Sequence, residues 1–172
     1  NDTVLINVGR LDPPKGQKNL LLAFKKVISK LKQVKLLIVG NGPLEKELKE
    51  LNDNLDLNDN VFFIGIRNDI NKLLQLSDIF ISTSFREGLS MSILEALYMK
   101  KPCIVSNMVY MQEVLKDNDT AFIINPYDIE GIAEKIIQYI ETGRIDEYEN
   151  LKKSLPAGLY EIMNIHGVGP KK

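Results

Sequence analysis

Short apolar runs alternate with longer amphipathic runs along most of the chain. Runs this short and this uniformly apolar are typical of strands buried on both faces of a parallel sheet. Most of them end at a glycine or a serine, which marks the start of a loop. The sequence therefore predicts strands at residues 4–8, 34–39, 61–64, 78–82, 103–106 and 121–124.

The segments between these runs carry apolar residues at helical spacing. Strands that alternate with helices predict an α/β fold with a doubly wound, Rossmann-like parallel sheet and a ligand crevice at the carboxyl ends of the strands. No G-x-G-x-x-G follows the first strand and no P-loop is present, which disfavours a plain dinucleotide enzyme or a nucleotide hydrolase. The expected helices span residues 19–31, 44–51, 69–76, 92–99, 111–115 and 129–140.

Loop residues at the predicted strand ends are the first candidates for ligand contact. They are Gly9, Gly40, Gly65, Ser84 and Ser106.

The length of 172 residues suits one domain, and 44% hydrophobic residues with a net charge of -1 indicate an ordinary globular protein. The charge balance does not suggest a nucleic-acid or membrane surface as partner. No run approaches the ~18 apolar residues of a membrane span, so the cytoplasm is the default location. The single cysteine, Cys103, lies in an apolar run and is expected to be a buried strand thiol.

The stretch from Phe85 to Ala96 lies where a predicted strand ends and a predicted helix begins. A helix that starts there directs unpaired N–H groups at the crevice, which favours a phosphate. Gly88 would allow a tight turn and a close approach to the ligand. Glu87 and Glu95 bracket the turn, and carboxylates beside a phosphate site suit hydrogen bonds from sugar or ribose hydroxyls. In the alternative interpretation, Ser92 and Glu95 form a capping box and Glu87 is a solvated acid.

Two cations flank the loop after the first predicted strand, Arg10 and Lys15. Facing the helix that starts near Gly88, they would form a diphosphate clamp that needs no metal. The alternative is two solvated surface charges, which is the commoner fate of a single Arg or Lys.

Taken together, several motifs resemble the nucleotide-sugar-binding, C-terminal half of retaining GT-B glycosyltransferases of group 1. The resemblance covers roughly residues 4–142, and it rests on the order and spacing of the motifs rather than on any one of them. The motifs are Gly9-Arg10-Leu11 with Lys15-Gly16, Val39-Gly40-Asn41-Gly42-Pro43, Ser77-Asp78, and Glu87-Gly88 with Glu95-Ala96.

The resemblance implies a role for each matched residue in binding a UDP-sugar or GDP-sugar donor. Arg10 and Lys15 would bind the diphosphate and stabilise the leaving nucleotide, and Glu95 would accept hydrogen bonds from the ribose. Glu87 would hold the hydroxyls of the donor sugar. Gly88 and the backbone of Leu89 and Ser90 would contact phosphate, and Ile66 and Arg67 would face the base. The family transfers a sugar with retention and needs neither a metal nor another cofactor for chemistry.

The chain departs from the family pattern in three ways. No glycine precedes Glu113, which puts a close backbone approach there in doubt, and Ser90 stands where many relatives carry glycine. The acceptor-binding domain of a GT-B enzyme is not recognisable in the sequence. We therefore expect this half alone to bind donor and to transfer little or no sugar. The full-length enzyme would be cytoplasmic or peripheral at the inner membrane.

The sequence character changes after Gly143, so the predicted domains are 1–143 and a tail, 144–172. Residues 155–172 resemble the opening of a helix-hairpin-helix element of family X DNA polymerases, with His166 in the hairpin and the second helix cut off. Glycine N–H groups of such a hairpin hold a DNA phosphate. The alternatives are a fused end, or an ordinary closing helix with a glycine-rich terminus. A non-enzymatic chimera with a DNA-binding fragment therefore stands beside the glycosyltransferase as a second hypothesis.

Overall fold

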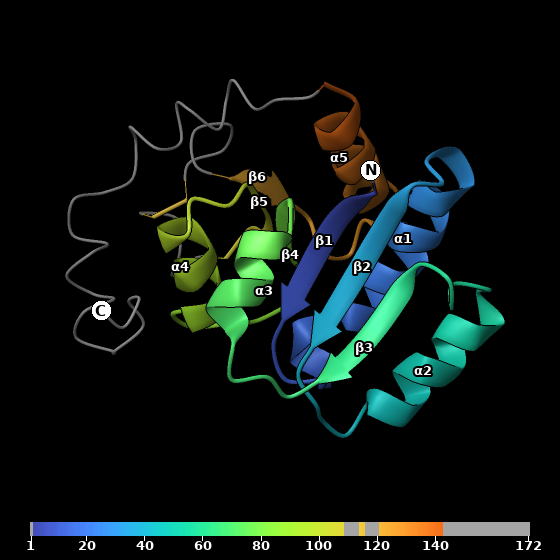
Figure 1. Cartoon of the computed structure of the whole chain (residues 1–172), viewed down its shortest axis with the longest axis horizontal. Helices are drawn as coiled ribbons and strands as arrows, with labels where there is room; N and C mark the ends of the chain where they lie inside the picture. The colour runs from blue at the N-terminus through green and yellow to red at the C-terminus, as the bar shows by residue number, and fades with distance from the viewer. Residues whose placement is uncertain (1, 109–113, 116–120, 143–172) are drawn as a thin grey trace.

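The computed structural model describes residues 2–108, 114–115 and 121–142. Its strands form one six-stranded sheet in the order β3-β2-β1-β4-β5-β6, and every neighbouring pair is parallel (Figure 1). The predicted doubly wound α/β fold is confirmed. The strands are β1 (Thr3–Val8), β2 (Val34–Val39), β3 (Val61–Gly65), β4 (Ile79–Ser82), β5 (Cys103–Ser106) and β6 (Phe122–Ile124).

Helices cover both faces of the sheet (Figure 1). Three of them, α1, α2 and α5, pack on one face, while α3 and α4 pack on the other. A short 3-10 turn, η1 (Pro13–Lys15), precedes α1. The helices are α1 (Gln17–Lys30), α2 (Glu45–Asn54), α3 (Ile70–Leu76), α4 (Met91–Tyr98) and α5 (Ile129–Thr142).

The alternation of side chains along each strand divides the core into two layers. Leu5 of β1 packs with Phe24 of α1 and Ile136 of α5, whereas its neighbour Ile6 packs in the layer that holds Leu94 of α4. All five of these apolar residues are fully buried. A slip of β1 by one residue would exchange the two layers, so their burial fixes the register of the strand.

The direction of the strand order reverses between β1 and β4. Backbone pairing between them covers only Leu5 with Ile79 and Ile6 with Phe80. Beyond that point, the side chain of Asn7 donates from Nδ2 to the carbonyl of Ile81 at 2.8 Å. Loops from two directions therefore leave the sheet side by side here, which is where open α/β sheets bind ligands.

Cys103 is buried on β5, as expected, and its thiol donates to the carbonyl of Lys101 at 3.2 Å. Burial raises the pKa of the Cys103 thiol well above its ordinary value, so the group stays neutral. Within the described ranges, no helix is long and apolar enough to cross a bilayer. Most of the expected helix at 111–115, with Glu113, and the hairpin prediction with His166 lie outside the described residues.

Candidate active site

The loops after β1 and β4 are held together at the point where the strand order reverses. Thr83 donates from Oγ1 to the carbonyl of Gly16 at 3.0 Å, and the N–H of Phe85 donates to the carbonyl of Pro14 at 2.8 Å. Gly16 has a φ of +69°, and a Cβ there would lie 2.1 Å from the carbonyl oxygen of Thr83. Only glycine fits this contact, which brings η1 against the loop that carries Glu87.

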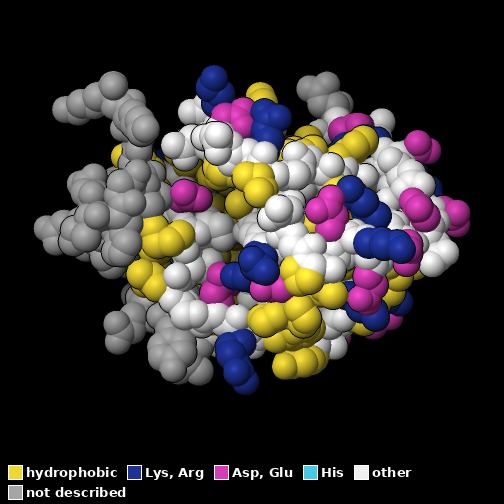
Figure 2. All heavy atoms as spheres, turned by 90° about the horizontal axis from the view of Figure 1, so that it is seen from below, with side chains coloured by type: hydrophobic (Ala, Val, Ile, Leu, Met, Phe, Trp, Pro, Cys, Tyr) yellow, Lys and Arg dark blue, Asp and Glu magenta, His cyan; other side chains and the backbone are white. Residues whose placement is uncertain are grey.

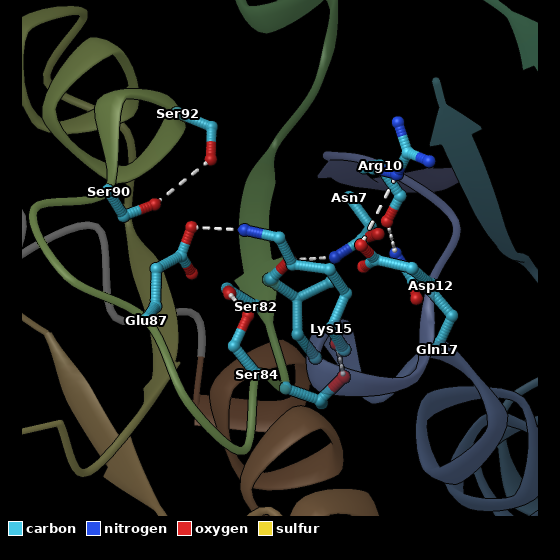
Figure 3. Close-up of polar contacts among 12 residues, drawn as sticks. Asn7, Arg10, Asp12, Lys15, Gln17, Ser82, Ser84, Glu87, Ser90 and Ser92 are labelled. Carbon is cyan, nitrogen blue, oxygen red and sulfur yellow. Dashed lines mark hydrogen bonds and ion pairs between the residues drawn. The ribbon is translucent and has the colours of Figure 1, made fainter. Parts of the chain in front are cut away.

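This contact between loops places Lys15 beside Glu87, although 72 positions separate them in the chain. The ammonium of Lys15 donates to Oε1 of Glu87, and Figure 3 shows the lysine side chain extended across the strand ends toward the carboxylate. The pair is partly buried, because the side chains are 25% and 13% exposed. Solvent therefore screens this ion pair less than the exposed pairs of the surface.

Arg10 lies on the same loop as Lys15 but has a different partner. Its Nε lies 3.4 Å from Oδ2 of Asp12, and its side chain is 68% exposed. The amide of Gln17, itself almost fully buried, donates to the carbonyl of Arg10 at 3.0 Å and so holds the loop. In Figure 3 the guanidinium of Arg10 and the ammonium of Lys15 point in different directions. The structure thus brings the two cations onto one loop without aiming both at the start of α4.

The segment that carries Glu87 is anchored by an aromatic contact. The ring of Phe85 stacks on that of Tyr127, with centroids 4.7 Å apart, and Tyr127 lies just before α5. Gly88 has no positive φ, and a Cβ there would meet nothing within 4 Å. Neither the backbone conformation nor the space around residue 88 therefore requires a glycine, in contrast to the tight turn expected there. The space beside Gly88 is open. The neighbouring Leu89 is also 46% exposed.

The capping box is not formed. Helix α4 begins at Met91 with Ser90 as N-cap, so Ser92 lies inside the helix, and Ser90 makes no side-chain cap hydrogen bond. The hydroxyl of Ser90 is instead buried and lies 3.2 Å from that of Ser92 (Figure 3). The first N–H groups of α4 have no partner within the helix, as at any helix start, and they lie next to Leu89 and Ser90.

Glu95 lies on the second turn of α4 and is half-buried. Its carboxylate has neither a hydrogen-bond nor an ion-pair partner in the described part of the chain. Burial raises the pKa of Glu95 above its ordinary value, because the charged form loses water and gains no cation. The burial of the Glu95 carboxyl therefore costs no stability at a pH below its unfolded-state pKa, where the group is neutral in both states. The stability of the fold falls as the pH rises through the raised folded-state pKa of Glu95.

A pocket of about 350 Å³ lies at the carboxyl ends of β1, β2 and β3. The guanidinium of Arg67 forms two 2.8 Å hydrogen bonds with the carboxylate of Asp69 at its mouth, and these bonds lower the pKa of Asp69. Ile66 is 68% exposed beside it. The pocket thus brings Arg10, Ile66 and Arg67 together, next to the Lys15–Glu87 pair rather than around it. Its lining residues are Val8, Gly9, Arg10, Val39, Gly40, Asn41, Ile66, Arg67 and Ile70.

The sequence of the chain matches the model of a known protein family. Residues 1–155 match the model of the glycosyl transferases group 1 family. The chain belongs to this family. It spans between 25% and 42% of the length of the curated relatives that it matches, so it corresponds to part of such an enzyme.

Two curated relatives illustrate the similarity. The chain is 33% identical over 141 residues to an Escherichia coli UDP-Gal:alpha-D-GlcNAc-diphosphoundecaprenol alpha-1,3-galactosyltransferase, a match that covers 80% of this chain and 36% of the relative. It is 32% identical over 150 residues to the capsular polysaccharide biosynthesis glycosyltransferase CapM of Staphylococcus aureus, a match that covers 86% of this chain and 39% of the relative.

Solved glycosyltransferase structures share the fold. Anabaena Alr3699/HepE in complex with UDP-glucose superimposes with a TM-score of 0.84 at 25% identity, covering 98% of this chain and 46% of that one. The C-terminal domain of a glycosyl transferase group 1 family protein (LpcC) from Francisella tularensis has a TM-score of 0.78 at 20% identity, covering 95% of this chain and 85% of that one. The second of these shows the fold alone.

Sequence reasoning missed several polar residues at this edge of the sheet. Asn7 and Gln17 are almost fully buried, and Asn7 Oδ1, Gln17 Oε1 and Asp12 Oδ1 accept no hydrogen bond in the described part of the chain. A polar residue inside the apolar run 4–8 was the available signal for Asn7. Conversely, Ser84 and Ser106, expected to reach a ligand, are buried: Ser84 lies 3.3 Å from the hydroxyl of Ser82, and Ser106 donates to the carbonyl of Ser82.

Figure 2 views the molecule from the side toward which the strands of Figure 1 run. Acidic and basic side chains intermingle near the middle of this face, in keeping with the Arg10–Asp12, Lys15–Glu87 and Arg67–Asp69 pairs. Among residues 2–108, 114–115 and 121–142, no three His, Cys, Asp or Glu side chains lie close enough together to hold a metal ion.

Proposed function

We propose that this chain is the donor-binding half of a retaining glycosyltransferase that uses a UDP-sugar and needs no metal for the transfer. Residues 1–143 form the nucleotide-sugar-binding domain, and a second domain supplies the acceptor site. The observation that carries the proposal is that Lys15 and Glu87 pair beside the loop that leads into α4, where the strand order reverses. Glu95, which has no side-chain partner among the described residues, lies one turn into that helix.

Each group of the donor has a matching partner at this edge. Lys15 and Arg10 provide positive charge for the diphosphate, and they stabilise the charge that develops on the leaving UDP. The backbone N–H groups of Leu89, Ser90 and the first turn of α4 add donors for phosphate, and the open space beside Gly88 leaves room for it. Cations and a helix start thereby take the place that a metal ion occupies in other transferases.

The remaining residues hold the two ends of the donor. The carboxylate of Glu95 accepts hydrogen bonds from the ribose, which compensates for its burial. The base lies in the pocket beside Ile66 and Arg67, where Asp69 fixes the plane of the guanidinium. Glu87 accepts hydrogen bonds from the donor sugar and orients its anomeric carbon toward the acceptor.

Two of the proteins that this chain resembles point to uracil as the base. The E. coli relative is named for UDP-Gal, and HepE was solved with UDP-glucose. Because the chain corresponds to less than half of such enzymes, we expect the isolated protein to bind the donor without transferring the sugar efficiently.

Glu95→Gln tests the ribose contact. The amide keeps the shape of the side chain but loses the charged acceptor, so the affinity for UDP should fall by about 1 to 3 kcal/mol in isothermal titration calorimetry. The same change should raise the free energy of unfolding at pH 7 and have no stabilising effect at about pH 3, which lies below the unfolded-state pKa, so that the acid is protonated in both states. A variant that binds UDP as tightly as the wild type would contradict the role of Glu95.

A further inference from the structure

The Lys15–Glu87 ion pair joins two residues that are proposed to bind different groups of the donor. Under the proposed function, Lys15 contacts the diphosphate and Glu87 contacts the sugar. In the structure each is the other's side-chain partner, and Glu87 has no other within the described ranges. A donor that uses both residues can therefore either separate this pair or share Lys15 with Glu87.

Burial makes a separation of the pair energetically significant. The Lys15–Glu87 side chains are 25% and 13% exposed, whereas those of the surface pair Lys18–Glu47 are 60% and 55% exposed. A carboxylate that loses its cation in a partly buried position loses more than it would in water. Glu87 is, in addition, beside the anionic oxygens that Lys15 would attract, and like charges this close repel.

We propose that Glu87, by competing for Lys15, makes the site discriminate between the sugar-bearing donor and the free nucleoside diphosphate. The inference rests on the proposed function of the site. The diphosphate of an intact UDP-sugar binds Lys15, and the hydroxyls of its sugar donate hydrogen bonds to Glu87 in place of the lost ammonium. The diphosphate of free UDP also binds Lys15, but free UDP offers no hydroxyl to Glu87, and its terminal phosphate carries one more negative charge.

As a consequence, Glu87 lowers the affinity of the site for the product UDP relative to its affinity for the UDP-sugar substrate. Once the sugar has left, Glu87 loses its hydroxyl partners and regains Lys15, which weakens the hold on UDP. The hydrogen bonds between the loops, from Thr83 to Gly16 and from Phe85 to Pro14, keep the side chains of Lys15 and Glu87 within reach of each other for this exchange.

The competing arrangement has Lys15 serving both partners at once. An ammonium has three N–H donors, so it could hold Glu87 and a phosphate together. Glu87 would then orient Lys15 for the phosphate, and its removal would weaken the binding of UDP. The two arrangements thus predict opposite signs for the same substitution.

The test is calorimetric titration of the wild-type chain and Glu87→Gln with UDP, and with UDP-glucose, UDP-galactose and UDP-N-acetylglucosamine. We expect Glu87→Gln to bind UDP about fivefold more tightly than the wild type and to bind no UDP-sugar more tightly. Glu87→Asp, which keeps the charge but draws it back from Lys15, should also tighten UDP binding. Glu47→Gln removes the same charge from an exposed pair and should change neither affinity.

The outcomes separate the inference from the function on which it rests. Equal or weaker UDP binding by a folded Glu87→Gln, in a chain whose wild type binds UDP, overturns the discrimination by Glu87 and leaves the donor site standing. A folded wild type that binds neither UDP nor any of the UDP-sugars overturns both. Melting temperatures of all variants establish that each is folded, and Glu87→Asp decides the question should Glu87→Gln not fold.

Discussion

Gly40→Ala is expected to lower the free energy of unfolding by about 3 kcal/mol in urea denaturation. Gly40 has a φ of +132°, a conformation that residues with a Cβ rarely adopt, and a Cβ there would lie 2.0 Å from the carbonyl oxygen of Gly9. The backbone at residue 40 and the carbonyl of Gly9 cannot easily move apart, because both belong to the main chain. The N–H of Gly40 also donates to the carbonyl of Gly65 at 2.8 Å, so the ends of β1, β2 and β3 are disturbed together.

Gly88→Ala is the matched control for this prediction. Its φ is not positive and its Cβ would meet nothing within 4 Å, so the stability should be unchanged or raised by a few tenths of a kcal/mol. If the two variants lost the same stability, the close approach of the Gly40 and Gly9 backbones would not be the reason why position 40 needs a glycine.

Lys15→Met is expected to weaken the binding of UDP by about 1.5 to 3 kcal/mol, which is roughly ten- to a hundredfold in the dissociation constant. The side chain keeps its length but loses the ammonium, and with it the charge-assisted hydrogen bonds to the diphosphate. Titration calorimetry of the variant and the wild type at one ionic strength measures the effect, since salt screens such contacts.

Lys18→Met controls for the loss of a positive charge from the same part of the chain. Lys18 lies in α1, is 60% exposed and pairs only with Glu47 at 3.4 Å among the described residues, so its substitution should leave the affinity for UDP within about twofold. If both lysine variants bind UDP like the wild type, Lys15 is not a phosphate ligand.

The secondary structure could be predicted from the sequence because each strand is a short apolar run with a polar or glycine boundary. The runs at 34–39 and 103–106 match β2 and β5 residue for residue, and α1 begins two residues before the expected position. The order of the strands could not be derived from these patterns. It depends on which apolar faces pack together, as with Leu5 and Ile6 on opposite sides of β1.

The residue types of the candidate site stay a prediction from the sequence, and the pairings among these residues were not predicted. Lys15 and Glu87 were expected to serve different ligand groups, and their direct contact depends on the close fit of Gly16 against Thr83, which no local pattern encodes. Gly40 was expected to reach a ligand; it lines the pocket, but its conformation is required by the approach of Gly9. Ser92 and Glu95 matched a capping box, which would make Ser92 the N-cap; α4 instead has Ser90 as its N-cap and starts two residues earlier than that box requires.

A thermal-shift titration of the chain with UDP, GDP and ADP tests the proposed donor site most directly. A ligand present at a hundred times its dissociation constant stabilises the folded state by about 2.7 kcal/mol, which raises the melting temperature of a chain of this size by about 5 °C or more. We predict a saturable rise with UDP and none of comparable size with GDP or ADP. A cooperatively melting protein whose transition is moved by none of the three at millimolar concentration would contradict the assignment of this edge as a nucleotide-sugar site.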